Sequence, residues 1–161
     1  MLRILMLMVF FCQYSFGQTT EKAFKPALLL GYNYNYNNKH FAEAGLVMGH
    51  RDSGKELIAG NLVYLYGVVS SEFLIASTET IFCPKVGVHL ALGFVHVGIT
   101  ALYYTDLKTQ AIGIRPEVGL TAAGVVSICY GWNMVNNLDE FSIYRANLGV
   151  KVIFGSGLKL W

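Results

Sequence analysis

The chain has 161 residues, of which 54% are hydrophobic and only 14% are charged, with a formal net charge of +2. Soluble proteins contain about 45–50% apolar and about 25% charged residues. The length leaves room for one domain, and the small net charge argues against nucleic-acid binding. A single small domain would struggle to hide this much apolar surface, so we expect a membrane or a partner to cover part of it.

The N-terminus has the pattern of a secretory signal peptide. Arg3 precedes an apolar run at 4–11, and Ser15-Phe16-Gly17 forms a small-x-small cleavage site before Gln18. The run is far shorter than the roughly 20 residues that a membrane-spanning helix needs. We predict a cleaved signal peptide at 1–17 and a single mature domain at 18–161. Removing Arg3 from the 12 basic residues leaves 11, against 10 acidic ones.

Apolar segments separated by turn-like clusters fill the mature chain. Gly, Asn, Asp and Ser dominate the clusters, as expected for turns. No segment with a helical period lies between them, so an up-and-down antiparallel meander is favoured over βαβ units. We predict eight strands, at 25–36, 41–51, 62–76, 80–92, 95–106, 110–122, 124–135 and 141–154.

Each predicted strand except 62–76, whose alternation is irregular and whose register stays open, has one bulky apolar face and one small, polar face. In 124–135, Val126, Ile128 and Tyr130 alternate with Ser127 and Cys129. A soluble barrel places bulky side chains inside and charges outside. Here glycines recur on the polar face, where the radius is smallest, so that face should be the inner one. We therefore predict an all-β fold for 18–161: an eight-stranded antiparallel up-and-down transmembrane β-barrel, apolar towards lipid, with a polar interior filled by side chains.

Charged residues recur on the predicted inward face. Buried charges must be paired and hydrogen-bonded, and an eight-stranded barrel is only wide enough for side chains. We therefore expect a structural ionic network, with a proton relay or a gated ionic plug as the functional alternative. Its expected members are Glu43, Glu72, Lys85, Arg115, Glu117 and Arg145. Lys151 also faces inward, but counting from the strand ends places it away from the others.

The same face carries His89, His96, Cys83 and Cys129. They lie on three predicted strands and no pair has ligand spacing, so we expect no metal and no cofactor. The two cysteines are on strands that are not neighbours, which favours free thiols. None of the serines at 70, 71, 77 and 127 lies in a Gly-x-Ser-x-Gly motif or beside a visible histidine–acid pair, so we predict that the protein is not an enzyme.

Two prolines and several aromatic residues are expected near the rims of the barrel. Pro84 and Pro116 lie inside predicted strands, where a missing N–H is disfavoured, so we expect local bulges there. Tyrosine and tryptophan gather at membrane interfaces. The residues expected near the outer rim are Tyr34, Tyr36, Phe73, Phe82, Tyr103 and Trp132. Phe154 and Trp161 are expected at the opposite rim.

Several segments resemble small outer-membrane β-barrel proteins of the Bacteroidetes type, which are Gram-negative bacteria. They are AEAGLVMG (42–49), PKVGVHLALG (84–93), ITALYYTD (99–106), IRPEVGL (114–120) and YGWNM (130–134). The resemblance implies a fold and a location, namely the cell outer membrane after export through the secretory pathway. It also implies the barrel assembly machinery as a partner during biogenesis. That machinery would read a C-terminal strand ending in an aromatic residue, either Phe154 or Trp161.

From these patterns we expect a monomer in contact with outer-membrane lipid, with a structural or surface-interaction role and no open pore. Two alternatives stay open. One is a soluble exported barrel that binds a small lipophilic ligand, which would need its bulky side chains inside. The other is a narrow outer-membrane pore.

Overall fold

The computed structural model describes residues 26–52, 63–75, 79–122 and 124–155. The predicted signal peptide at 1–17 and Trp161 lie outside these residues. No helix in the described ranges is long and apolar enough to cross a membrane. The elements are β1 (Ala27–Asn35), β2 (Lys39–Asp52), β3 (Val63–Ile75), β4 (Phe82–Leu92), β5 (Val95–Thr105), β6 (Gln110–Ala122), β7 (Val126–Trp132), β8 (Met134–Val135), the 3-10 helix η1 (Leu138–Phe141) and β9 (Ala146–Phe154).

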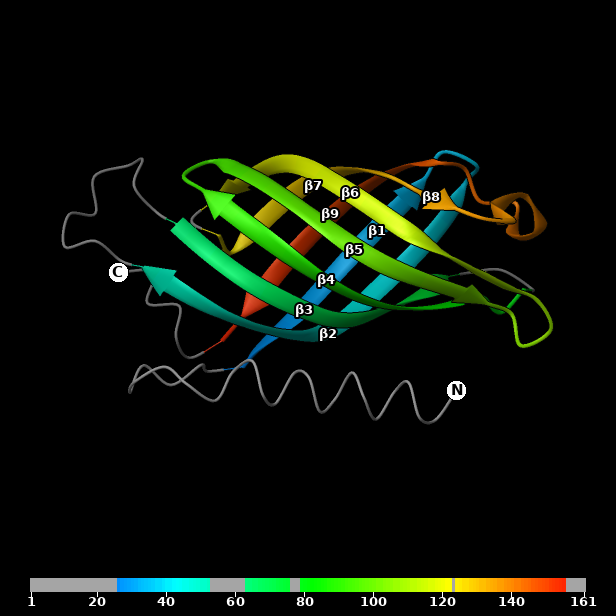
Figure 1. Cartoon of the computed structure of the whole chain (residues 1–161), viewed down its shortest axis with the longest axis horizontal. Helices are drawn as coiled ribbons and strands as arrows, with labels where there is room; N and C mark the ends of the chain where they lie inside the picture. The colour runs from blue at the N-terminus through cyan, green and yellow to red at the C-terminus, as the bar shows by residue number, and fades with distance from the viewer. Residues whose placement is uncertain (1–25, 53–62, 76–78, 123, 156–161) are drawn as a thin grey trace.

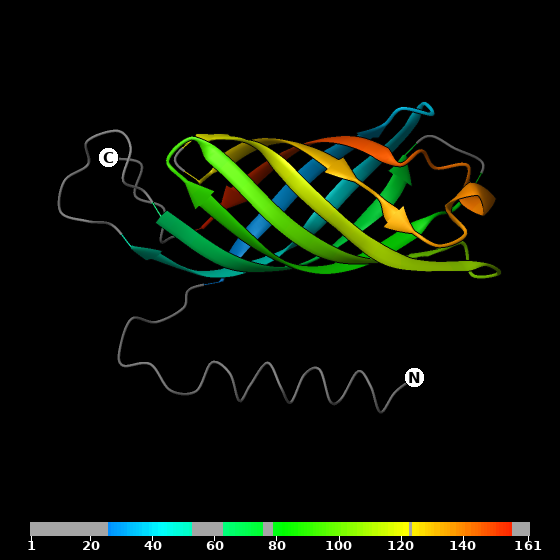
Figure 2. The ribbon, with the colours of Figure 1, turned by 45° about the horizontal axis from the view of Figure 1, so that its top comes forward.

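The strands close into a barrel (Figures 1 and 2). Consecutive strands pair antiparallel from β1 to β6, β7 pairs with β6 and β9, and β9 returns to β1. The short β8 also pairs with β6, in line with β7, so the two form one interrupted strand. The predicted eight-stranded, all-antiparallel, up-and-down barrel is confirmed. Closure leaves no free sheet edge.

The register keeps one parity inward around the ring. Gly31 lies opposite Glu43, and Glu43 lies opposite Glu72. Leu29 is 1% exposed, whereas its neighbours Leu28 and Leu30 are 46% and 44% exposed. Because side chains alternate along each strand, this parity places the glycine-rich polar face inside, as the sequence predicts.

Both prolines interrupt a ladder without creating a bulge, so the predicted bulges are wrong. Between β4 and β5 the pairs Phe82–Thr105 and Lys85–Leu102 enclose two unpaired residues on each strand. The same holds where Pro116 separates the pairs Ile114–Met134 and Glu117–Gly131. The reason is that proline has no N–H to donate, so hydrogen bonds are lost while the residue count stays equal.

The last predicted strand starts later than expected. Residues 141–145 are not strand, and β9 begins at Ala146. The chain instead forms η1 and folds into the barrel mouth at the end where β1 meets β2, which we call the loop end (right in Figure 1). Leu138, Phe141 and Ile143 are buried there. The break between β7 and β8 falls at Asn133, whose N–H donates to the Arg145 carbonyl at 2.6 Å.

Apolar side chains close the barrel at both ends. The cluster at the loop end consists of Phe41, Ile81, Cys83, Leu102, Tyr104, Ala111, Leu138, Phe141 and Ile143. The cluster at the other end, where β1 begins and β9 ends, consists of Ala27, Leu29, Val47, Tyr64, Tyr66, Val68, Ala91 and Ile153. The polar interior lies between these two clusters.

Candidate functional site in the barrel interior

Arg115, on β6, is the centre of the interior network. Its Nη1 lies 2.6 Å from Glu72 Oε1 and its Nη2 lies 3.2 Å from Glu72 Oε2, a two-pronged pair between β6 and β3. Nη2 also donates to the Tyr104 hydroxyl at 2.6 Å, and Nε donates to Asn133 Oδ1 at 2.6 Å. The planar guanidinium suits this fork geometry, and these four contacts tie β6 to β3, to β5 and to the β7–β8 break.

Lys85, on β4, links two carboxylates. Its Nζ lies 2.7 Å from Glu72 Oε1 and 2.8 Å from Glu43 Oε1. Glu43 also accepts hydrogen bonds from Ser70 Oγ at 2.8 Å and Asn33 Nδ2 at 2.9 Å. A single ammonium group thereby joins the carboxylates of β2 and β3, which would otherwise repel each other.

Glu117 joins the network to a second layer, farther from the loop end. It forms an ion pair with Lys151 on β9, and its Oε1 lies 3.8 Å from Arg115 Nη1. On its other side, His89 Nδ1 lies 3.7 Å from Glu117 Oε2.

Two stacked imidazoles form that second layer. The rings of His89 and His96 lie 5.1 Å apart with an interplanar angle of 12°. His96 Nε2 lies 3.1 Å from His89 Nδ1 and 3.0 Å from the Tyr66 hydroxyl, while His96 Nδ1 lies 2.8 Å from Cys129 Sγ. If both imidazoles are neutral and carry their proton on Nδ1, His96 Nδ1–H donates to Cys129 Sγ, and His89 Nδ1–H and the Tyr66 hydroxyl share the single lone pair of His96 Nε2.

The buried charges balance. Among the described residues the buried carboxylates are those of Glu43, Glu72 and Glu117, and the buried cations are those of Lys85, Arg115 and Lys151. These six side chains are at most 6% exposed. Three negative charges facing three positive ones, with apolar clusters at both ends, make a neutral network shut off from bulk water. Such a network fills the barrel and ties its strands together.

Five of the six residues predicted for the network lie in it: Glu43, Glu72, Lys85, Arg115 and Glu117. Arg145 does not. It is exposed in the segment before β9, because the chain leaves strand geometry there and the alternation no longer sets its direction. Lys151 takes part although it was expected to lie apart. The alternation had already placed the polar partners Asn33, Tyr104 and Asn133 on the inward face, without assigning them to the network.

The hydroxyls and thiols of the interior are buried, and the two serines described there donate hydrogen bonds within it. Ser70 donates to Glu43, and Ser127 donates to Thr121 Oγ1 at 3.0 Å. Cys83 and Cys129 are free and buried. Within the described ranges no group of three or more His, Cys, Asp or Glu side chains is arranged to hold a metal ion.

Comparison with known proteins adds little to this description. No known protein family matches the chain, and no curated protein matches it. A solved structure titled "De novo design of transmembrane beta-barrels" is similar at 11% sequence identity and a TM-score of 0.45, over 84% of this chain and 98% of that one. A likeness at this level concerns general architecture alone. The fold and the interior define this protein as a closed eight-stranded antiparallel barrel with an apolar exterior and an ionic interior.

Proposed function

We propose that the protein is an integral outer-membrane β-barrel with a structural or surface-interaction role, exported through the secretory pathway and closed to solutes. Outer-membrane lipid surrounds it, and the barrel assembly machinery inserts it. It acts as a monomer, without cofactor or nucleic acid. The observation that carries the proposal is the inverted distribution of polarity: ionic inside, apolar outside.

The outer wall supports a lipid environment. Leu120 is 67% exposed, Ile112 62% and Val118 53%, and they belong to a belt of exposed apolar side chains that runs around the barrel. Among the outward strand side chains that the structure describes, none belongs to Lys, Arg, Asp or Glu. An apolar surface of this extent would drive aggregation in water. In a bilayer the same side chains contact the hydrocarbon chains of the lipids.

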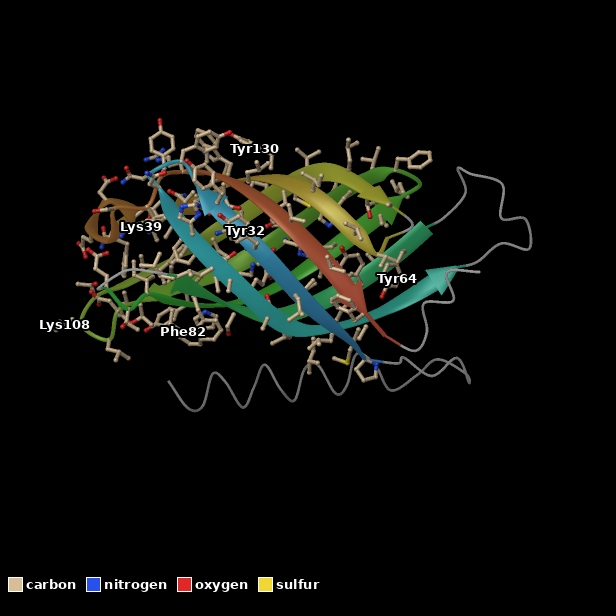
Figure 3. The ribbon with its side chains drawn as sticks, turned by 180° about the vertical axis from the view of Figure 1, so that it is seen from behind. Tyr32, Lys39, Tyr64, Phe82, Lys108 and Tyr130 are labelled. Atoms are coloured by element: carbon tan, nitrogen blue, oxygen red, sulfur yellow. The ribbon has the colours of Figure 1, made fainter. Side chains whose placement is uncertain are left out.

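Strand lengths and aromatic residues fit the same environment. The strands β1, β4, β5 and β9 have 9, 11, 11 and 9 residues, and a tilted strand needs about 9–11 residues to cross the hydrocarbon core. Tyr32 and Tyr130 lie on the outer wall (Figure 3). At the loop end Phe73 packs against Phe82 with ring centroids 5.0 Å apart. Aromatic residues at this level match an interfacial girdle.

The filled interior supports a closed barrel rather than a pore. A Cβ added at Gly98 would lie 2.2 Å from His89 Nδ1, and one added at Gly131 would lie 2.8 Å from Arg115 Cδ. Side chains of neighbouring strands therefore occupy the space over these glycines, and Arg115 on β6 reaches across the interior to Glu72 on β3. The same filling argues against a soluble barrel that holds a lipophilic ligand, because such a barrel needs an apolar interior with free space.

Cell fractionation combined with gel migration tests the proposal. The expected result is recovery in the outer-membrane fraction, with folded and boiled samples migrating differently because the closed barrel resists detergent. In planar bilayers the purified protein should give almost no conductance. Recovery as a soluble protein in detergent-free buffer contradicts the membrane assignment, and reproducible single-channel steps contradict the closed state.

A further inference from the structure

The segment 138–143, called the stopper below, closes the loop end of the barrel without belonging to its wall. It lies between β8 and β9, outside every strand ladder. Leu138, Phe141 and Ile143 are 3–4% exposed and pack among wall residues that include Phe41 and Leu102. The stopper therefore fills the mouth with three apolar side chains that the sheet's hydrogen bonds do not hold.

The backbone on either side of η1, which forms most of the stopper, is suited to a hinge. Asn137 has φ 56° and ψ 28°, and Ser142 has φ 50° and ψ 36°, so two non-glycine residues adopt the left-handed conformation. That conformation is unfavourable for most L-residues. A change in these two residues would let the turn between them swing out while the strands stay paired.

In the part of the chain that the structure describes, two side-chain hydrogen bonds reach backbone carbonyls of the stopper from its exposed side. Lys39 Nζ, on β2, donates to the Phe141 carbonyl at 2.7 Å and forms an ion pair of 2.7 Å with Glu79 Oε2. Asn37 Nδ2 donates to the Ser142 carbonyl at 2.8 Å. Lys39 thus joins three separate loop segments at this end of the barrel: the β1–β2 turn, the segment before β4 and the stopper. It lies outside the buried ionic network.

A thiol lies in the apolar cluster that the stopper completes. Cys83 belongs to the same apolar cluster as Phe141 and is 0% exposed. Cys129 lies deeper, against His96, in the second layer of the interior. Opening of the mouth would expose the first thiol and leave the second covered.

From these contacts we propose that the stopper is a hinged closure, latched by Lys39, that opens locally to uncover an apolar socket at the mouth while the barrel and its ionic network stay intact. Segments that few contacts hold open with a smaller free energy than the whole protein. The socket is bounded by Phe41, Ile81, Leu102 and Tyr104, with the Tyr104 hydroxyl on Arg115 as its floor. This proposal goes beyond the closed barrel proposed above, because the loop end is then closed only while the stopper is in place.

Thiol labelling of the full-length protein, refolded in detergent micelles, tests the latch. A water-soluble maleimide is added, and peptide mass spectrometry measures the modification rates of Cys83 and Cys129 separately. Lys39→Met should raise the Cys83 rate by about tenfold, the effect of losing one charge-assisted hydrogen bond. Phe141→Ala should also raise it. Lys108→Met, at an exposed position on the β5–β6 turn, is the matched control and should leave both rates unchanged.

Cys129 separates local opening from unfolding. If the stopper opens as a hinge, the modification rate of Cys129 stays at the parent value in each variant, and the folded band on gels is retained. Two results overturn the proposal: an unchanged Cys83 rate in Lys39→Met, or a joint rise of both thiols, which would mean that the barrel opens as a whole. Lys39→Met alone decides the matter if Phe141→Ala does not fold. The measurement does not depend on where the protein resides in the cell, so failure here leaves the membrane assignment standing.

Discussion

Arg115 and Glu72, 43 residues apart in the sequence, form a two-pronged ion pair across the barrel interior, with both side chains 0% exposed. The pair joins β6 to β3, strands that are not neighbours in the sheet. A contact of this kind exists only in the closed barrel. Its energetic role is therefore to stabilise closure, and it can be tested by removing one partner.

Glu72→Gln keeps the size of the side chain and removes its charge. We expect a loss of roughly 3–5 kcal/mol in the free energy of unfolding, because the buried cations Arg115 and Lys85 would lose the carboxylate that both of them contact. Urea unfolding of the reconstituted protein, followed by gel migration, measures it. The matched control is Glu79→Gln at the exposed loop end, where the ion pair with Lys39 should contribute about 1 kcal/mol or less. Equal losses in the two variants would contradict a buried network.

Val118→Arg places a charge on the outer wall. If that wall faces lipid, the substitution costs roughly 2–4 kcal/mol near the middle of the membrane. In a water-soluble barrel the same change at a 53% exposed position would be nearly neutral. Unfolding titrations in lipid vesicles distinguish the two cases.

Gly119→Ala tests how closely the backbones of β6 and β7 approach each other. An added Cβ would lie 2.0 Å from the Ile128 carbonyl oxygen, which is backbone and cannot move aside. We expect a loss of about 1–3 kcal/mol, typical of overpacking. Gly67→Ala on the outer wall is the control, because its Cβ would have no neighbour closer than 3.7 Å. The prediction fails if both variants are as stable as the parent.

Asp106 sets the pH dependence of the β5–β6 turn. Hydrogen bonds from the Thr109 N–H, the Thr109 hydroxyl and the Lys108 N–H lower the pKa of this carboxyl from 3.8 to about 2. A lowered pKa means that these bonds stabilise the turn above pH 3.8, and that this contribution is lost as the pH falls through about 2. An NMR titration of the carboxyl carbon in micelles should therefore show a midpoint near 2. A midpoint at or above 3.8 would show that the turn bonds do not form.

Residue alternation was sufficient to predict the wall of the barrel. Wherever the chain is an extended strand, period-two alternation sets the direction of every side chain, so Arg115 and Glu117 could be placed inside without knowing their partners. Arg145 was misplaced because the rule was applied to a segment that is not a strand. If 141–154 were one strand, the apolar Phe141 and Ile143 would share the inward face with Asn147 and Lys151, and that departure from the apolar–polar pattern is the signal that could have revealed the stopper.

Depth in the barrel was harder to predict than direction. Lys151 was placed away from the network by counting residues from the strand ends. In the register it lies opposite Gly31, which lies opposite Glu43. Strands in a barrel are tilted and staggered, so the count from one rim does not give the depth of a residue. The pairing of neighbouring strands gives the offset from one strand to the next, and this offset sets the depth of each residue. A single sequence does not state that offset explicitly.

The orientation of the wall can be measured directly with a spin label at position 118. The variant Val118→Cys, labelled with a nitroxide and reconstituted in lipid vesicles, reports collisions with oxygen, which concentrates in the hydrocarbon core, and with a water-soluble nickel chelate. The inverted barrel predicts frequent collisions with oxygen and very few with the chelate. A label that meets the chelate freely, on a chain that stays folded without lipid, would contradict the account.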